Sequence, residues 1–130
     1  MPASGDVIEG HGGFRLTLLR TDPDLLEMEA SYGGTAGPPP EHLHPRQDER
    51  FTVLEGKLRT VIGGVECDYE AGDSFDVPAG TRHQVNAPGP ARVRWEVRLA
   101  LRTAEFFARL YGGGAGDGFL EEFSEEIRFT

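Results

Sequence analysis

Cysteine is almost absent from this sequence. Cys67 is the one cysteine among 130 residues, so no disulfide can form within the chain, which fits a reducing compartment such as the cytoplasm. Long apolar runs are missing too, since no stretch approaches the roughly 18 to 20 apolar residues that a membrane-spanning helix requires. The first residues have neither the basic cluster nor the apolar run of a signal peptide. We therefore expect a cytoplasmic protein without a membrane partner.

Basic residues are scarce: 13 lysine and arginine side chains face 22 aspartate and glutamate side chains, and the formal net charge is -9. A surface this acidic repels phosphate backbones, and no run of basic residues offsets it. The most basic stretch, Arg92 to Arg102, alternates basic with apolar residues, as the solvated face of a strand does. We expect no nucleic-acid partner.

Short alternating runs broken by glycine, proline and aspartate fill most of the sequence, and this pattern is typical of an all-β domain. With 130 residues and 38% hydrophobic content, the chain has the size of one globular domain with its own core. The alternation is clearest from Val93 to Leu99, where odd positions are apolar and even positions are charged. We predict strands over residues 14–18, 26–32, 51–54, 58–62, 65–69 and 93–99.

The hydrophobic period changes after Arg102. Thr103 can cap a helix that begins there. The apolar side of that helix would hold Phe106, Phe107, Leu110 and Tyr111. Residues 112–118 form a glycine-rich linker. A last helical turn or two would follow, with the apolar residues Phe119, Leu120, Phe123 and Ile127.

Strand after strand followed by one helix predicts an all-β fold, a β-barrel or jelly roll with a short C-terminal helical appendage. We place the barrel domain in residues 1–102, with its core at about 14–101, and the appendage packed on it in residues 103–130. The sequence shows no internal repeat and no second domain.

Three of the four histidines stand where a metal site would need them. His42 and His44 are two residues apart, and on a strand such side chains project from the same face. Glu49 has no strict parity with them, but a bend at Pro45 would bring it round to the same centre. His83 is the candidate for a third imidazole. The fourth histidine lies in a glycine-rich start and is expected at the surface.

Two stretches of the sequence resemble the paired motifs of the cupin superfamily. Residues 37–56 resemble the first motif, Gly-x5-His-x-His-x(3 or 4)-Glu-x6-Gly, with an opening gap that is one residue short. Residues 72–86 resemble the second motif, Gly-x5-Pro-x-Gly-x2-His-x3-Asn, which is complete through His83, while Asn86 arrives one position early. A spacer of 15 residues, 57–71, separates the two motifs, as in compact single-domain cupins.

The resemblance to small single-domain cupins of the RmlC-like superfamily implies a jelly-roll barrel that holds one divalent transition metal ion, Fe, Mn, Ni, Cu or Zn. It implies His42, His44, Glu49 and His83 as the ligands. It also implies that Gly56, Gly72 and Gly80 are turn residues with positive φ, and that the chain forms a homodimer. Gln47 shares strand parity with Glu49, so its oxygen is an alternative ligand or a contact to a bound substrate.

An apolar pocket wall is expected, and it suggests a small, partly apolar organic molecule as the partner. The candidate pocket residues are Phe51, Val53, Phe75, Val77, Val85, Val93 and Trp95. We expect a metal-dependent enzyme, with an oxygenase or dioxygenase favoured. The alternatives are a non-redox isomerase, epimerase, cyclase or decarboxylase that uses the metal as a Lewis acid, and a binding module without turnover, because the fold hosts many chemistries.

Overall fold

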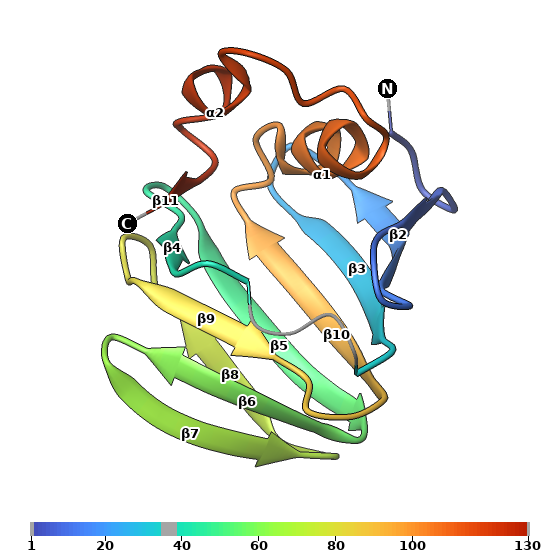
Figure 1. The fold of residues 1–130 in the computed structure, drawn as a ribbon, viewed down its shortest axis with the longest axis vertical. Helices are drawn as coiled ribbons and strands as arrows, with labels where there is room; N and C mark the ends of the chain where they lie inside the picture. The colour runs from blue at the N-terminus through green and yellow to red at the C-terminus, as the bar shows by residue number, and fades with distance from the viewer. Residues whose placement is uncertain (1, 35–38, 130) are drawn as a thin grey trace.

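A computed structural model describes residues 2–34 and 39–129 of the chain. Within these residues eleven strands form two antiparallel sheets (Figure 1). The first sheet has the strand order β1 (Val7–Glu9), β2 (Arg15–Thr21), β3 (Leu26–Tyr32), β10 (Ala91–Arg98), β5 (Asp48–Glu55) and β8 (Ser74–Val77). The second sheet has the order β11 (Arg128–Phe129), β4 (His42–Leu43), β9 (His83–Asn86), β6 (Lys57–Ile62) and β7 (Val65–Glu70). The fold is an all-β jelly roll with a short helical appendage.

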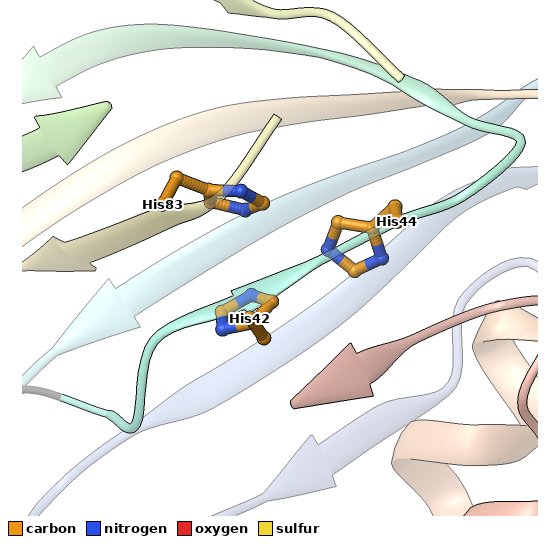
Figure 2. Close-up of side chains that lie close together, drawn as sticks. All are labelled: His42, His44 and His83. Atoms are coloured by element: carbon orange, nitrogen blue, oxygen red, sulfur yellow. The ribbon is translucent and has the colours of Figure 1, made fainter. Parts of the chain in front are cut away.

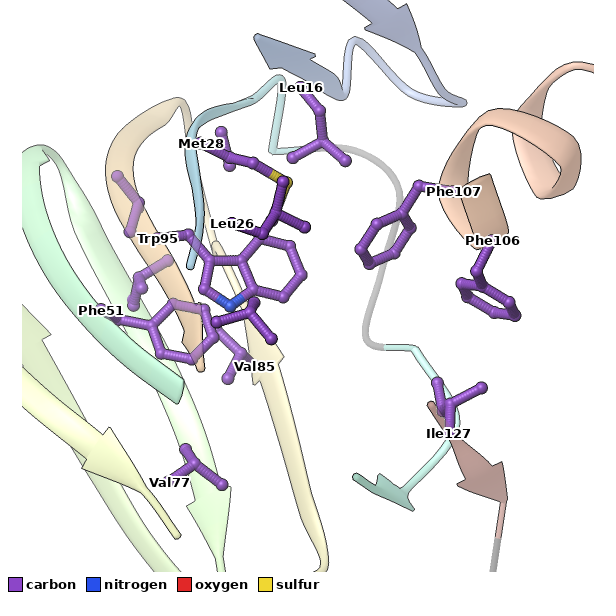
Figure 3. Close-up of a cluster of buried hydrophobic side chains, with 14 of the residues drawn as sticks. Leu16, Leu26, Met28, Phe51, Val77, Val85, Trp95, Phe106, Phe107 and Ile127 are labelled. Carbon is purple, nitrogen blue, oxygen red and sulfur yellow. The ribbon is translucent and has the colours of Figure 1, made fainter. Parts of the chain in front are cut away.

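The core lies between the two sheets and is built by alternation along each strand. In β10, Val93, Trp95 and Val97 are buried, while Arg94 and Arg98 are exposed, as period-2 patterning predicts. Buried side chains of this size each stabilise the fold by about 1.5–3 kcal/mol. Figure 3 shows how Trp95 and its aromatic and aliphatic neighbours fill the space between the sheets.

The predicted strand over residues 93–99 ends one residue early. Leu99 is 42% exposed and lies outside β10, so its side chain does not continue the buried row. The chain leaves the sheet here because the backbone oxygens of Leu99 and Ala100 turn toward a buried side chain, the amide of Gln47. Strand β10 therefore ends where the link to the first helix begins.

Helix α1 spans Thr103–Tyr111, and two details of its prediction are wrong. Thr103 does not cap the helix, because Arg102 occupies the cap position and makes no side-chain capping bond. The Thr103 hydroxyl instead accepts a hydrogen bond from Gln47 Nε2 at 2.6 Å. Phe106 and Phe107 are buried as expected, but Leu110 is 38% exposed and faces away from the core.

The segment after α1 returns to the second sheet. No helix or strand forms over residues 112–118, and α2 (Phe119–Glu122) follows. Phe119 stacks on Phe106 with ring centroids 5.2 Å apart, and Phe123 is fully buried. The short strand β11 then pairs with β4, a pairing that the sequence did not predict. The division into domains at residue 102 stays a prediction, and residue 130 lies outside the described residues.

The motif glycines adopt the backbone conformation expected of them. Gly56, Gly72 and Gly80 have φ angles of 79°, 94° and 78°. Gly56 is also close to a neighbouring turn, since a Cβ there would lie 2.4 Å from the backbone oxygen of Pro90. The first glycine of the first motif, Gly37, lies outside the described residues. Neither helix in residues 2–34 and 39–129 has the length and apolar character needed to cross a membrane.

Candidate metal centre

Strands β4 and β9 bring the three histidines together (Figure 2). His42 and His83 are direct partners across this antiparallel pair, so their side chains share one face of the sheet. Their ring centroids are 4.4 Å apart, and the ring of His44 lies 5.1 Å from His42 and 5.3 Å from His83. One ligand nitrogen of each ring lies within 4.8 Å of the others. The predicted three-histidine cluster therefore exists in the fold.

Each histidine ring is oriented by a backbone carbonyl. In every case Nδ1 lies 2.7–2.9 Å from the oxygen: Pro40 for His42, Glu126 for His44 and Thr81 for His83. A carbonyl oxygen only accepts hydrogen bonds, so each Nδ1 bears the proton, and in a neutral ring Nε2 keeps its lone pair. This arrangement is typical of histidines that bind a metal through Nε2.

Glu49 approaches the histidines from the opposite sheet. A turn at Pro45 and Arg46 moves the chain from β4 to β5, where Glu49 points inward between two exposed neighbours. Its Oε1 lies 3.0 Å from His83 Nε2 and 3.3 Å from His44 Nε2. The strand ends before Pro45, as predicted. Glu49 reaches the histidines because the chain crosses to the other sheet, not because one strand bends.

The ionisation of the centre follows from burial and mutual attraction. Burial opposes the charged form of Glu49, but the neighbouring His44 and His83 and the Trp95 indole lower its pKa below the ordinary value. Burial also opposes a charge on His83, but the adjacent carboxylate of Glu49 raises its pKa. Burial, with the two neighbouring histidines, lowers the pKa of His42 to about 4. Glu49 and His83 thus each oppose the effect of burial on the other's pKa.

The donor atoms of this centre fit a cation. His44 Nε2 and Glu49 Oε1 are buried atoms without a hydrogen-bond partner in the described part of the chain. Because Nδ1 of His44 donates to the Glu126 carbonyl, its Nε2 directs a lone pair at Glu49 Oε1, which also holds lone pairs. This contact is repulsive unless a proton or a metal lies between the two atoms. Imidazole nitrogens with one carboxylate oxygen suit Fe, Mn, Ni, Cu and Zn.

Gln47 has a structural role that the sequence did not predict. Its side chain is fully buried, and its Nε2 donates to Leu99 O at 2.6 Å, Ala100 O at 3.0 Å and Thr103 Oγ1 at 2.6 Å. The amide thus joins the start of β5 to the start of α1. Its Oε1 has no hydrogen-bond partner among the described residues, and a contact from this oxygen to a metal or substrate stays a prediction.

Two contacts to the centre could not be identified from sequence patterns. The Trp95 indole Nε1 donates to Glu49 Oε2 at 2.8 Å, whereas the strand pattern indicated Trp95 only as a pocket residue. Glu126, which holds His44 through its backbone oxygen, is itself buried and 82 residues away in sequence. Every residue type has a backbone carbonyl, so the sequence does not indicate which carbonyl contacts His44. That contact is seen only in the fold.

All seven candidate pocket residues are buried in the core, and their contact with a substrate stays a prediction. Val77 also lines an open cleft of about 380 Å³ together with Glu49 and mostly charged residues of β5, β8 and β10. A larger cleft of about 580 Å³ lies between β1 and α1. None of the three clustered histidines lines this larger cleft, so cleft size alone does not indicate the chemistry.

One protein family matches this chain. The family described as the cupin domain matches residues 28–100, which is more than half of the 130-residue chain. The chain belongs to the cupin family. The match includes the segments with His42, His44, Glu49 and His83.

Individual relatives of this cupin include one protein named as an oxidoreductase and one named as a dioxygenase. The chain is 38% identical over 77 residues to oxidoreductase iacF of Pestalotiopsis fici, covering 58% of this chain and 34% of the relative. It is 36% identical over 64 residues to quercetin 2,3-dioxygenase of Bacillus subtilis, covering 49% of this chain and 19% of the relative. The chain thus spans about a third of the length of the first relative and about a fifth of the second.

Among solved structures, a RmlC-like cupin from Shewanella frigidimarina is similar with a TM-score of 0.69 and 22% identity. The similarity covers 77% of this chain and 88% of that one. At this identity the likeness supports the fold and says nothing of the reaction.

Proposed function

We propose that this cupin binds one divalent transition metal ion through His42, His44, His83 and Glu49, and that it is an oxygenase of the dioxygenase type. The observation that supports the metal site is the convergence of three carbonyl-oriented imidazoles on one buried carboxylate, with Oε1 3.0 and 3.3 Å from two ring nitrogens. The names of the two relatives, quercetin 2,3-dioxygenase and oxidoreductase iacF, support the redox class.

The chain's own residues would hold the metal and balance its charge. Glu49 supplies one negative charge, while the three neutral imidazoles supply nitrogen donors, a set that tolerates several first-row metals. When bound, such an ion supplies a Lewis acid that is redox-active if it is iron, manganese, nickel or copper. The carbonyls that hold the Nδ1 atoms keep the three rings oriented before the ion arrives.

The substrate we propose is a small, partly apolar organic molecule. Phe51, Phe75 and Trp95 form a stacked aromatic row beside Glu49, with ring centroids 4.9 and 5.2 Å apart along the row. A wall of this kind favours flat or apolar groups and keeps water from the carboxylate. The apolar residues at this wall would thus select the substrate, while the donor atoms bind the ion.

Metal content tests the site. The protein is expressed without added metal, and its metals are measured by mass spectrometry for the wild type and for His42→Ala, His44→Ala and His83→Ala. His11→Ala is the matched control, because His11 is exposed and lies outside the cluster. We expect bound metal in the wild type and in the control, and most of it lost in the other variants, with the β-rich circular dichroism spectrum retained. Equal metal content throughout would contradict the site.

Oxygen uptake tests the reaction class. Quercetin, the compound in the name of one relative, serves as the probe, with an oxygen electrode and the loss of quercetin absorbance as readouts. We expect uptake that requires the bound metal and disappears in His83→Ala. Bound zinc without oxygen uptake would contradict the oxygenase and favour non-redox Lewis-acid chemistry or binding without turnover.

A further inference from the structure

Trp95 makes a buried hydrogen bond to the carboxylate that faces the histidines. Its Nε1 donates to Glu49 Oε2 at 2.8 Å, and both side chains are buried, with exposed fractions of 8% and 2%. The two oxygens of Glu49 therefore have different surroundings. Oε2 accepts the indole hydrogen bond, while Oε1 faces the ring nitrogens of His44 and His83 and has no hydrogen-bond partner within residues 2–34 and 39–129.

The indole is held in place by packing on both sides. Trp95 lies opposite Phe51 in the pairing of β10 with β5, and the two rings stack with centroids 5.2 Å apart and planes at 20°. Phe107 of α1 contacts it edge-on at 5.4 Å. Because the ring is fixed and an indole N–H can only donate, the hydrogen bond fixes the plane of the carboxylate.

We propose that Trp95 is a positioning residue that presents Glu49 to the metal through Oε1 alone. This inference rests on the proposed ligand set. A carboxylate can bind a metal through one oxygen or both, and a second oxygen would occupy one more coordination position. By holding Oε2, Trp95 keeps that position open for a substrate atom. The indole does not titrate, so this constraint persists at every pH at which the fold is stable.

A double-mutant cycle tests whether Trp95 acts through Glu49. Zinc affinity is measured by competition with a chelator for the wild type, Trp95→Phe, Glu49→Ala and the double variant. Trp95→Phe keeps an aromatic ring and removes the N–H, and we expect it to weaken zinc binding by about 10–100-fold, as loss of a ligand's hydrogen-bond partner does. In the Glu49→Ala background the same change should have no further effect. Phe107→Leu is the control, since it loosens the packing of Trp95 but leaves the bond to Glu49.

Two spectroscopic readouts separate this role from general packing. Loaded with cobalt, Trp95→Phe should show weaker visible absorption than the wild type, because a released Oε2 adds a ligand, whereas Phe107→Leu should keep the wild-type spectrum. Trp95 is the one tryptophan of the chain, so its indole N–H gives one nitrogen–proton NMR signal. That signal should lie downfield and exchange slowly in the zinc-loaded wild type, and move upfield in Glu49→Ala.

The outcomes distinguish the inference from the proposed function. If Glu49→Ala binds zinc as tightly as the wild type, the ligand set is wrong. If Glu49→Ala weakens binding but Trp95→Phe costs the same affinity with and without Glu49, Trp95 acts only through packing and the inference is overturned. Should Trp95→Phe fail to fold, the NMR signal of the wild type still decides, since an indole resonance at the position of free indole in the zinc-loaded protein would overturn it.

Discussion

Replacing Gln47 with glutamate exchanges a donor for an acceptor at a place where two backbone carbonyl oxygens converge. In the native chain the two N–H hydrogens of Nε2 are shared among Leu99 O, Ala100 O and Thr103 Oγ1, at 2.6–3.0 Å. A carboxylate there would lose the hydrogen bonds to the two backbone carbonyl oxygens and place its own oxygens against them, whereas the Thr103 hydroxyl can turn and donate to it. Each lost bond costs about 1 kcal/mol net, and an acceptor left buried and unpaired costs about 1–3 kcal/mol.

We therefore expect Gln47→Glu to lower the free energy of unfolding by about 3–5 kcal/mol at neutral pH. For a domain of this size, that corresponds to a melting temperature lower by about 10–20 °C. The loss should shrink as the pH falls, because the buried carboxyl would have a raised pKa and its protonated form donates one hydrogen bond. Urea unfolding followed by circular dichroism measures both effects.

Gln84→Glu provides the matched control. Gln84 is half-buried, and its Nε2 donates to a single acceptor, Pro39 O, at 2.8 Å. The same chemical change should therefore cost about 1 kcal/mol there. If Gln47→Glu and Gln84→Glu were equally stable at neutral pH, Gln47 would not join the sheet to the helix in the way argued above.

Two further predictions concern pH and assembly. In the metal-free protein, the pKa of His42 is lowered to about 4. As the pH falls below 6.5, His42 is therefore protonated in the unfolded state before it is protonated in the folded state. Its contribution lowers the free energy of unfolding between pH 6.5 and 4. His42→Gln should remove on the order of 3 kcal/mol of this decrease in urea titrations, and parallel curves for the two proteins would contradict it. We also propose a homodimer, because β7 is an edge strand with Val65 67% exposed; a light-scattering mass near the 14.2 kDa of one chain would count against it.

The local features of the fold and site could be predicted because they depend on short-range pattern. The alternation in β3 and β10 follows directly from which residues are apolar. The i, i+2 spacing of His42 and His44 placed both on one face, and the second motif supplied His83 as their partner.

The features that were missed depend on contacts between distant residues. Thr103 was predicted as a helix cap, but its hydroxyl instead accepts a hydrogen bond from the amide of Gln47, 56 residues earlier. Leu110 fits a helical stripe, yet α1 buries Phe106 and Phe107 and leaves the side chain of Leu110 exposed. The pairing of β11 with β4 involves two residues on each strand, too short a pattern for sequence periodicity to detect.

The hydrogen bond from His44 to the Glu126 carbonyl has a consequence for the order of folding. It joins residues 82 positions apart, whereas the hairpin of β6 and β7 closes within 14 residues, from Lys57 to Glu70. Closing a long loop costs more chain entropy than closing a short one, so it follows the local hairpins. The orientation of the His44 ring is thus fixed late, after the sheets have formed. A metal ion present during refolding should therefore bind to an already assembled barrel rather than act as its nucleus.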